Sequence, residues 1–361
     1  MKQEATMSQE NKMGVMPINR LLVSMSVPIM ISMLVQALYN IVDSMFVAQL
    51  NENALTAVSL AFPAQNLMIA VATGTGVGIN ALLSKSLGEK NFQKVNQVAD
   101  HAIFLAFCSY AVFAVLGLAF SRTFFTLQTQ DPQIVQYGTE YLQICTLFSF
   151  GLFFQITFER LLQATGKTIY TMITQGIGAI INIISDPIMI LGYFGFPELG
   201  VAGAAIATVL GQILSMVYAL WVVLTGDHAV KITLRGFRPK GRIIRDIYAV
   251  GFPSIIMQSI TSFLTVCLNM ILIDFSEVAV SVLGVYFKLQ SFIFMPVFGL
   301  NQGVMPIMGY SYGARNRERL LEALKWGFCI PASIMTVGTL LFWLLPEVFL
   351  GFFNPTQELL D

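Results

Sequence analysis

Long apolar runs alternate with short polar connections along almost the whole chain. Each run is longer than the roughly 20 residues that a helix needs to cross the hydrocarbon core of a bilayer. Several are long enough to require tilted or kinked helices. The pattern predicts an all-α polytopic membrane protein with about nine transmembrane helices, at residues 20–49, 54–84, 96–121, 136–158, 168–194, 199–225, 246–273, 279–310 and 321–350.

The lysine and arginine residues gather on one side of these predicted spans. All 20 except Arg122 and Lys288 lie in the N-terminal tail or at every second connection. The opposite connections, such as 49–53 and 274–278, contain acids but no bases. Because basic residues are enriched in cytoplasmic loops, we expect a multi-pass protein of the cell membrane with its N-terminus in the cytoplasm.

Composition agrees with this class and argues against several others. Only 11% of the residues are charged, compared with about 25% in soluble domains. The formal net charge is zero, which gives no support to a nucleic-acid partner. Gly166-Lys167-Thr168 resembles the end of a phosphate-binding loop, but Leu161 stands at the first glycine position. We therefore expect no enzyme, no nucleotide and no cofactor beyond a coupling ion.

The chain aligns with itself, without a gap, when it is shifted by 225 residues. Prolines, glycines and polar residues coincide in the pairs Pro28 and Pro253, Gln65 and Gln290, Gly74 and Gly299, Gly78 and Gly303, Ser86 and Ser311, Gly88 and Gly313, and Asn91 and Asn316. Apolar composition alone does not produce this register. The repeat holds six spans, an even number, so both copies enter the membrane from the same side, as in the parallel repeats of secondary transporters.

This repeat predicts four parts of the chain. They are a cytoplasmic tail (1–19), an N-terminal six-helix lobe (20–225), a cytoplasmic linker (226–245) and a C-terminal lobe of three helices (246–361). Residue 361 corresponds to residue 136 of the first copy. We therefore expect the last three of twelve helices to be missing.

Ionisable residues inside a span are costly and point to function. Asp43 and Asp186 lie at a similar predicted depth, roughly 10 Å and roughly 12 Å from the outer membrane face at 1.5 Å per residue. Asn182 lies one turn before Asp186, and Thr208 is at a comparable level in the sixth span. The four residues are suited to Na⁺ coordination or to holding a proton, unless each aspartate only bonds to a neighbouring helix. Glu159, at a helix end, is predicted to be solvated.

Other features leave alternatives open. Pro187 frees a backbone carbonyl that is a further possible ligand, or it is only a kink. Lys288 pairs with an acid, faces an aqueous cleft or extends to the membrane interface. The 29 Phe and 18 Met residues suit an adaptable apolar cavity, although most are expected to face lipid or to pack between helices.

Three stretches of the chain resemble the multidrug and toxic compound extrusion (MATE) family, in its MepA-like and DinF-like branch. They are residues 27–47, with Val27-Pro28 and Asp43-Ser44-Met45-Phe46-Val47, residues 200–208 and residues 298–303. The resemblance implies two six-helix lobes around a central cleft that opens alternately to either side. It also implies export of cationic amphipathic drugs driven by inward H⁺ or Na⁺.

The resemblance also assigns roles to individual residues. The first-span acid of the family falls on Asp43, its fifth-span amide and acid on Asn182 and Asp186, and its sixth-span hydroxyl on Thr208, so that these four would hold H⁺ or Na⁺ in the N-terminal lobe. A cavity tyrosine of the family matches Tyr39. We expect the substrate cavity to include Tyr39, Gln36 and Lys288.

Thr261 stands where the NorM-like branch has a seventh-span glutamate, which argues against a cation site in the C-terminal lobe. The expected partners are small cationic drugs and membrane lipids, and the chain is expected to be a monomer. A flippase for lipid-linked precursors, with a similar two-lobe architecture, is the alternative function. A channel or a membrane scaffold would need no ion-coupling acids.

Overall fold

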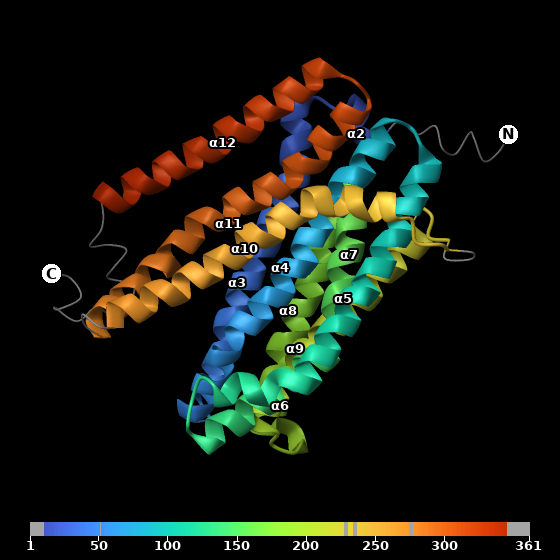
Figure 1. The fold of residues 1–361 in the computed structure, drawn as a ribbon. Coiled ribbons are helices and arrows are strands. Elements are labelled where there is room, and N and C mark those ends of the chain that lie inside the picture. Colours follow the sequence, from blue (N-terminus) through green and yellow to red (C-terminus); the bar gives the residue numbers. More distant parts are fainter. Residues whose placement is uncertain (1–10, 51, 227–229, 234–236, 274–276, 345–361) are drawn as a thin grey trace.

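The structure is a computed structural model that describes residues 11–50, 52–226, 230–233, 237–273 and 277–344. Within these ranges the regular secondary structure is helical, and the predicted all-α fold class is confirmed (Figure 1). The elements are α2 (Lys12–Val15), α3 (Ile18–Ala48), α4 (Glu52–Gly88), α5 (Phe92–Thr126), α6 (Pro132–Leu147), α7 (Phe150–Ala164), α8 (Thr168–Leu191), the 3-10 helix η1 (Tyr193–Gly195), α9 (Gly200–Thr225), α10 (Gly241–Ile273), α11 (Glu277–Gly313) and α12 (Arg317–Leu344).

Each of the nine predicted segments falls on helical structure over the residues that the structure describes, and the last of them is described as far as Leu344. Among the described residues, α3, α4, α5, α8, α9 and α12 are each long and apolar enough to cross a membrane, and α6 and α7 together make a seventh span. Helices α10 and α11, of 33 and 37 residues, coincide with the predicted segments 246–273 and 279–310. The chain is therefore a multi-pass membrane protein.

The predicted single span 136–158 is in fact two helices. Helices α6 and α7 meet at an angle of 44°, because Phe148 leaves the helical backbone conformation at φ −100° and ψ 14°. Gly151 then brings α7 close to α9, where an added Cβ would lie 3.0 Å from Cγ1 of Ile213. No proline or polar cluster interrupts the apolar run at this bend. Hydrophobicity alone therefore predicts one continuous span here.

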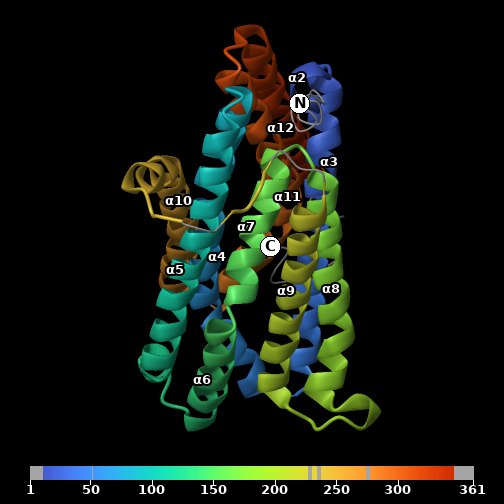
Figure 2. The same cartoon turned by 90° about the vertical axis from the view of Figure 1, so that its right-hand side faces the viewer.

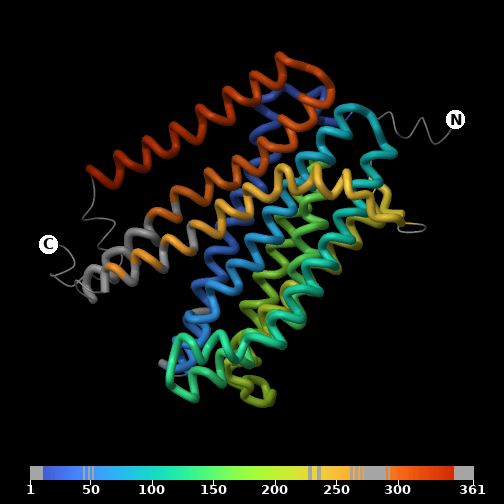
Figure 3. Tube along the Cα trace, in the orientation of Figure 1, coloured from blue at the N-terminus to red at the C-terminus, as the bar shows by residue number. Residues whose placement is uncertain are grey.

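The helices form two groups, which we call the first bundle (α3–α9) and the second group (α10–α12). Helices α10 to α12 extend to one side of the first bundle (Figure 1). In Figure 2, α10 lies on the side of α4 and α5, and α8 and α9 lie on the opposite side. Helix α4 packs along α10, and α3 packs along α11 (Figure 3), although these pairs are far apart in the sequence.

The sequence repeat reappears as a pair of matching contacts between the two groups. A Cβ on Gly74 in α4 would overlap Ile255 of α10, and a Cβ on Gly299 in α11 would overlap Met30 of α3. Gly299 and Gly74 are repeat partners, as are Ile255 and Met30, so the two interfaces are equivalent. The repeated glycines are explained by this close approach, which small residues permit between membrane helices.

A second pair of repeated glycines lies where α4 crosses α11. A Cβ on Gly88 would overlap the carbonyl of Tyr310, and a Cβ on Gly313 would overlap the carbonyl of Lys85. The turns that follow are also matched, since Lys90 and its repeat partner Arg315 both have φ of 55°. We call this end of the molecule, where α4 and α11 finish, the basic end.

The two groups pack together near the basic end and diverge away from it. Contacts between them include the approach of Gly88 to Tyr310 at the basic end and hydrogen bonds farther along, from Ser26 to Leu300 (3.4 Å) and, at the middle of α4, from Thr73 to Gln258 (2.8 Å). Toward their far ends, α10 and α11 point away from the lower end of the first bundle (Figure 1). The molecule is therefore V-shaped, with the junction at the basic end.

A short helix that the sequence pattern did not predict joins the groups at the basic end. The side chain of Met13 in α2 is fully buried. Nη2 of Arg319, from α12, donates to the carbonyls of Met13 and Met16, each at 2.8 Å. Burial here also lowers the pKa of the Lys12 ammonium group. Part of the predicted tail 1–19 is thus packed structure.

Candidate functional site

A cavity of ≈ 520 Å³ lies between the first bundle and the second group. Its lining is mixed, with apolar side chains such as Met33, Leu152 and Phe298 among amides, hydroxyls and a few charged groups. A lining of this kind, with a small number of placed polar groups, is typical of sites for small molecules. Gln36 and Tyr39, which the sequence analysis placed in a cavity, both line it.

Asp43 and Asp186 lie close enough for a side-chain hydrogen bond between their carboxyl groups. Asp43 comes from α3 and Asp186 from α8, two helices that pack along each other. Nδ2 of Asn182 lies 3.4 Å from Oδ1 of Asp186 and 3.5 Å from Oγ1 of Thr208 in α9. The structure therefore brings together the four residues that the sequence singled out, which we call the carboxylate cluster. Asn182 and Thr208 also line the cavity.

Three oxygen atoms of the carboxylate cluster are buried without a hydrogen-bond partner among the described residues. They are Oδ1 of Asp43, Oδ1 of Asn182 and Oδ2 of Asp186. A buried acceptor that stays unpaired costs about 1–3 kcal/mol. Two carboxyl groups can share a hydrogen bond only when one of them carries a proton. A proton, or a hard cation that takes oxygen ligands, would satisfy this arrangement.

Two tyrosines and two glutamines surround the carboxylate cluster. The hydroxyl of Tyr39 lies within hydrogen-bonding range of Gln36 and near both carboxyl groups. Nε2 of Gln65 donates to the hydroxyl of Tyr141 at 3.1 Å, and Tyr141 lies in the field of Asp43. Tyr141, which lies in α6, had no predicted role. The repeat did single out Gln65.

A second polar cluster lines the cavity on α7, α8 and α11, and it contains the carboxyl group of Glu159. Glu159 was predicted to be solvated, and this is wrong, because its side chain is only 4% exposed. It accepts a hydrogen bond from Gln155 at 3.0 Å and from Gln175 at 2.9 Å. Arg160 is also buried, and its Nη1 donates to Gln163 at 2.7 Å and to Gln302 at 2.6 Å.

The position of Glu159 explains the error. The predicted span ended at residue 158, whereas α7 continues to Ala164. Gln155, Glu159 and Gln163 are spaced by four residues, so they form one polar stripe on α7. That spacing was the sequence signal for a cavity-facing side.

The MatE family model matches residues 28–188 and 253–361. The chain belongs to the MatE family. This confirms the family resemblance, and the all-helical fold with its long apolar helices agrees with it.

Relatives of this MatE chain include a transporter and several solved structures. The multidrug export protein MepA of Staphylococcus aureus (strain MSSA476) is 24% identical over 352 residues, covering 96% of this chain and 76% of MepA. The chain in a crystal structure of MATE in complex with MaL6 has 26% sequence identity to this chain. The two superpose with a TM-score of 0.90, over 98% of this chain and 78% of the other. An outward-facing multidrug resistance MATE family transporter has 28% sequence identity to this chain. The two superpose with a TM-score of 0.83, over 94% of this chain and 75% of the transporter.

Two expectations for this MatE chain fall on side chains outside the described set. Lys288 lies within α11 and Thr261 within α10, but the structure does not describe either side chain. The cavity role of Lys288 and the argument from Thr261 therefore stay predictions. Pro187 lies inside α8, which is continuous from Thr168 to Leu191. The use of a freed carbonyl as a cation ligand also stays a prediction.

Proposed function

We propose that the chain is a secondary transporter that exports cationic amphipathic compounds in exchange for H⁺ or Na⁺. The observation that carries this proposal is that the half-buried carboxyl group of Asp43 and the buried one of Asp186 lie within hydrogen-bonding range, next to a cavity of ≈ 520 Å³. Intramembrane acids of this kind are typical of ion-coupled transport. The drug class and the direction of transport are supported by the name of the relative MepA, a multidrug export protein.

Coupling would follow from competition at the carboxylate cluster. A proton or Na⁺ bound by Asp43 and Asp186 neutralises the cluster, and its loss leaves negative charge that attracts a cationic compound into the cavity. Asn182 and Thr208 belong to both the cluster and the cavity lining. Each ligand thus changes the environment of the other, as exchange requires.

The V shape supports an assignment of conformational state. If the basic end faces the cytoplasm, as the distribution of Lys and Arg predicts, the packed junction closes the cytoplasmic side. The diverging ends then open the cavity region toward the outside of the cell membrane. Alternating access would require the contacts at the basic end to separate and those at the far end to form.

Gradient-driven transport tests the proposed function. We expect proteoliposomes that contain the 361-residue chain to move ethidium against its concentration gradient when a H⁺ or Na⁺ gradient is imposed. Protein-free liposomes and collapse of the gradient with an ionophore are the controls. Movement that only follows the ethidium gradient, and never opposes it, would contradict exchange and indicate a channel.

A lipid-precursor flippase is the alternative function, and one observation favours it. Arg160 places a buried base in the cavity lining, and an anionic lipid precursor would need a base there. The adjacent Glu159 carboxyl offsets that charge. Gradient-independent movement of a pyrophosphate-linked lipid in the same proteoliposomes, without ethidium transport, would favour the flippase.

We expect the carboxylate of Glu159 to pair with the positive charge of the transported compound, in the half of the cavity nearer the basic end. In Glu159→Gln we expect the ethidium concentration for half-maximal efflux to rise about tenfold, since a charged hydrogen-bond partner contributes about 1.5–3 kcal/mol. The matched control is Glu140→Gln, because Glu140 is an exposed acid on α6. An equal, small change in both variants would remove Glu159 from the substrate site.

A further inference from the structure

A second pocket, of ≈ 470 Å³, lies at the basic end and is separate from the cavity described above. One wall comes from the end of α4, with Lys85 and Glu89. The other comes from the α11–α12 junction, with Ser311, Arg315 and Arg317. The pocket is thus shared between the first bundle and the second group, close to the crossing of Gly88 and Gly313.

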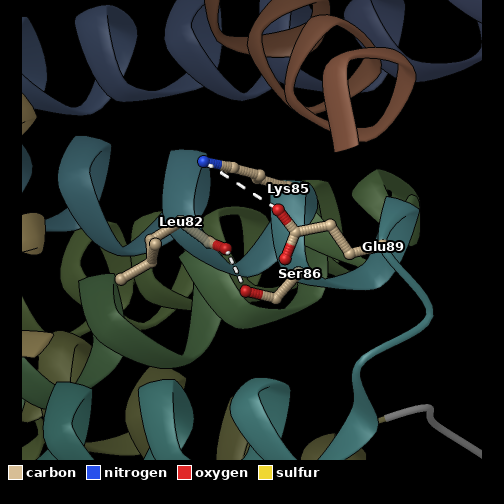
Figure 4. A network of polar contacts seen from close by, with 4 residues as sticks. All are labelled: Leu82, Lys85, Ser86 and Glu89. Carbon is tan, nitrogen blue, oxygen red and sulfur yellow. Dashed lines mark hydrogen bonds and ion pairs between the residues drawn. The ribbon is translucent and has the colours of Figure 1, made fainter. Parts of the chain in front are cut away.

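The charge of this pocket is positive. Three bases line it, against the single acid Glu89. Nζ of Lys85 lies 3.9 Å from Oε1 of Glu89 (Figure 4), and both side chains are more than a third exposed, so this pair is weak. The 28-residue helix α12 begins at Arg317, and a helix start favours anions because its first N–H groups are unpaired.

A buried hydroxyl without a partner also belongs to this pocket. Ser311 is 1% exposed, and its Oγ makes no hydrogen bond to any described residue. Its repeat partner Ser86 does make one, from Oγ to the carbonyl of Leu82 at 2.8 Å (Figure 4). That bond, to the carbonyl four residues earlier, is the usual one for a serine in a helix. The repeat is therefore broken at the position that lines the pocket.

We propose that this pocket binds the phosphate group of an anionic membrane lipid. A phosphate accepts hydrogen bonds from arginine, lysine and hydroxyl groups together, which matches Arg315, Arg317, Lys85 and the free Ser311 hydroxyl. The spans α4 and α11 end here, so the pocket lies at the level where lipid headgroups meet a basic surface. A phosphate held by residues of both groups stabilises the packed junction of the basic end.

Lipid titration of the purified 361-residue chain in detergent tests this site. The readout is the phosphatidylglycerol concentration that gives half of the maximal rise in thermal unfolding midpoint. We expect this concentration to increase about fivefold in Arg317→Gln and in Lys85→Gln, because each base near an anionic lipid contributes about 1 kcal/mol. For Ser311→Ala the expected increase is about threefold, the effect of one hydrogen bond.

Two matched controls separate this site from general effects of charge and helix stability. Arg238→Gln removes an exposed base elsewhere at the same end, and Ser86→Ala removes the repeat partner of Ser311. Both are expected to keep the phosphatidylglycerol dependence of the unchanged chain. Equal lipid dependence in all five variants would overturn the proposal.

Two further titrations identify the source of the phosphate. Phosphatidylcholine, whose headgroup has no net charge, is expected to give no saturable rise. Inorganic phosphate at millimolar concentration is expected to give less than a tenth of the lipid effect. The opposite outcome is that inorganic phosphate raises the unfolding midpoint as much as the lipid does, with the Arg317, Lys85 and Ser311 variants reducing both effects equally. In that case the pocket is a phosphate site and the lipid assignment is overturned.

Discussion

Asp186→Asn and Asp43→Asn are each expected to reduce ion-coupled ethidium efflux at least about 100-fold, to the level of cells without the protein. Asparagine keeps the size and much of the hydrogen-bonding capacity of aspartate, but it neither releases a proton nor provides a negative charge for Na⁺. The two carboxyl groups lie within hydrogen-bonding range of each other and form one site, so we expect the loss of either to disable it.

The abundance of the membrane-inserted protein must be measured beside efflux. Both asparagine variants are expected to be produced normally, since an amide removes a buried charge from the span. The matched control is Asp131→Asn, because Asp131 caps α6 outside the cluster and asparagine is an equally good cap. Normal efflux in both Asp43→Asn and Asp186→Asn would remove the carboxylate cluster from the transport cycle.

Gly88→Ala and Gly313→Ala are expected to lower efflux at least about tenfold by keeping the basic end from closing. An added Cβ at either position would meet the backbone of the partner helix, at Tyr310 or at Lys85. Backbone cannot give way as a flexible side chain can, and overpacking of this kind costs about 1–3 kcal/mol. That cost falls only on the state in which the basic end is packed.

A cysteine at Ser84 reports the opening of the basic end. Ser84 is fully buried, and its Cβ would lie 3.0 Å from a Cβ on Gly309. With Ser84→Cys as background, Gly88→Ala should speed labelling of that cysteine by a membrane-impermeant thiol reagent, read from the modified peptide. Gly176→Ala is the control, since nothing lies within 4 Å of a Cβ there. Equal labelling and efflux in both variants would contradict this role of the glycines.

Much of the fold followed from the sequence because the membrane imposes simple rules. A span must be long and apolar, so most of the predicted segments coincide with helices among the described residues, with the segment 136–158 divided between α6 and α7. The carboxylate cluster was foreseen for the same reason, since equal depth in neighbouring spans brings Asp43 and Asp186 to one level. The 225-residue repeat was also visible in the sequence, while the contacts that require its glycines were visible only in the structure.

Other features could not be read from the pattern. The bend between α6 and α7 lies at Phe148 and Ser149, where no proline interrupts the apolar run. Glu159 was misplaced because a helix end was set six residues too early, at 158 instead of Ala164. The V shape has no signal in the sequence, since an alternating transporter must be compatible with two arrangements of its lobes.

Ion release on drug binding tests the central claim most directly. Purified chain is mixed with excess ethidium in weakly buffered solution, and released H⁺ is followed with a pH dye while released Na⁺ is followed with an ion-selective electrode. The account predicts that about one cation leaves per bound ethidium, and that Asp43→Asn and Asp186→Asn release none. Ethidium binding with no cation release, or release that is unchanged in both variants, would contradict it.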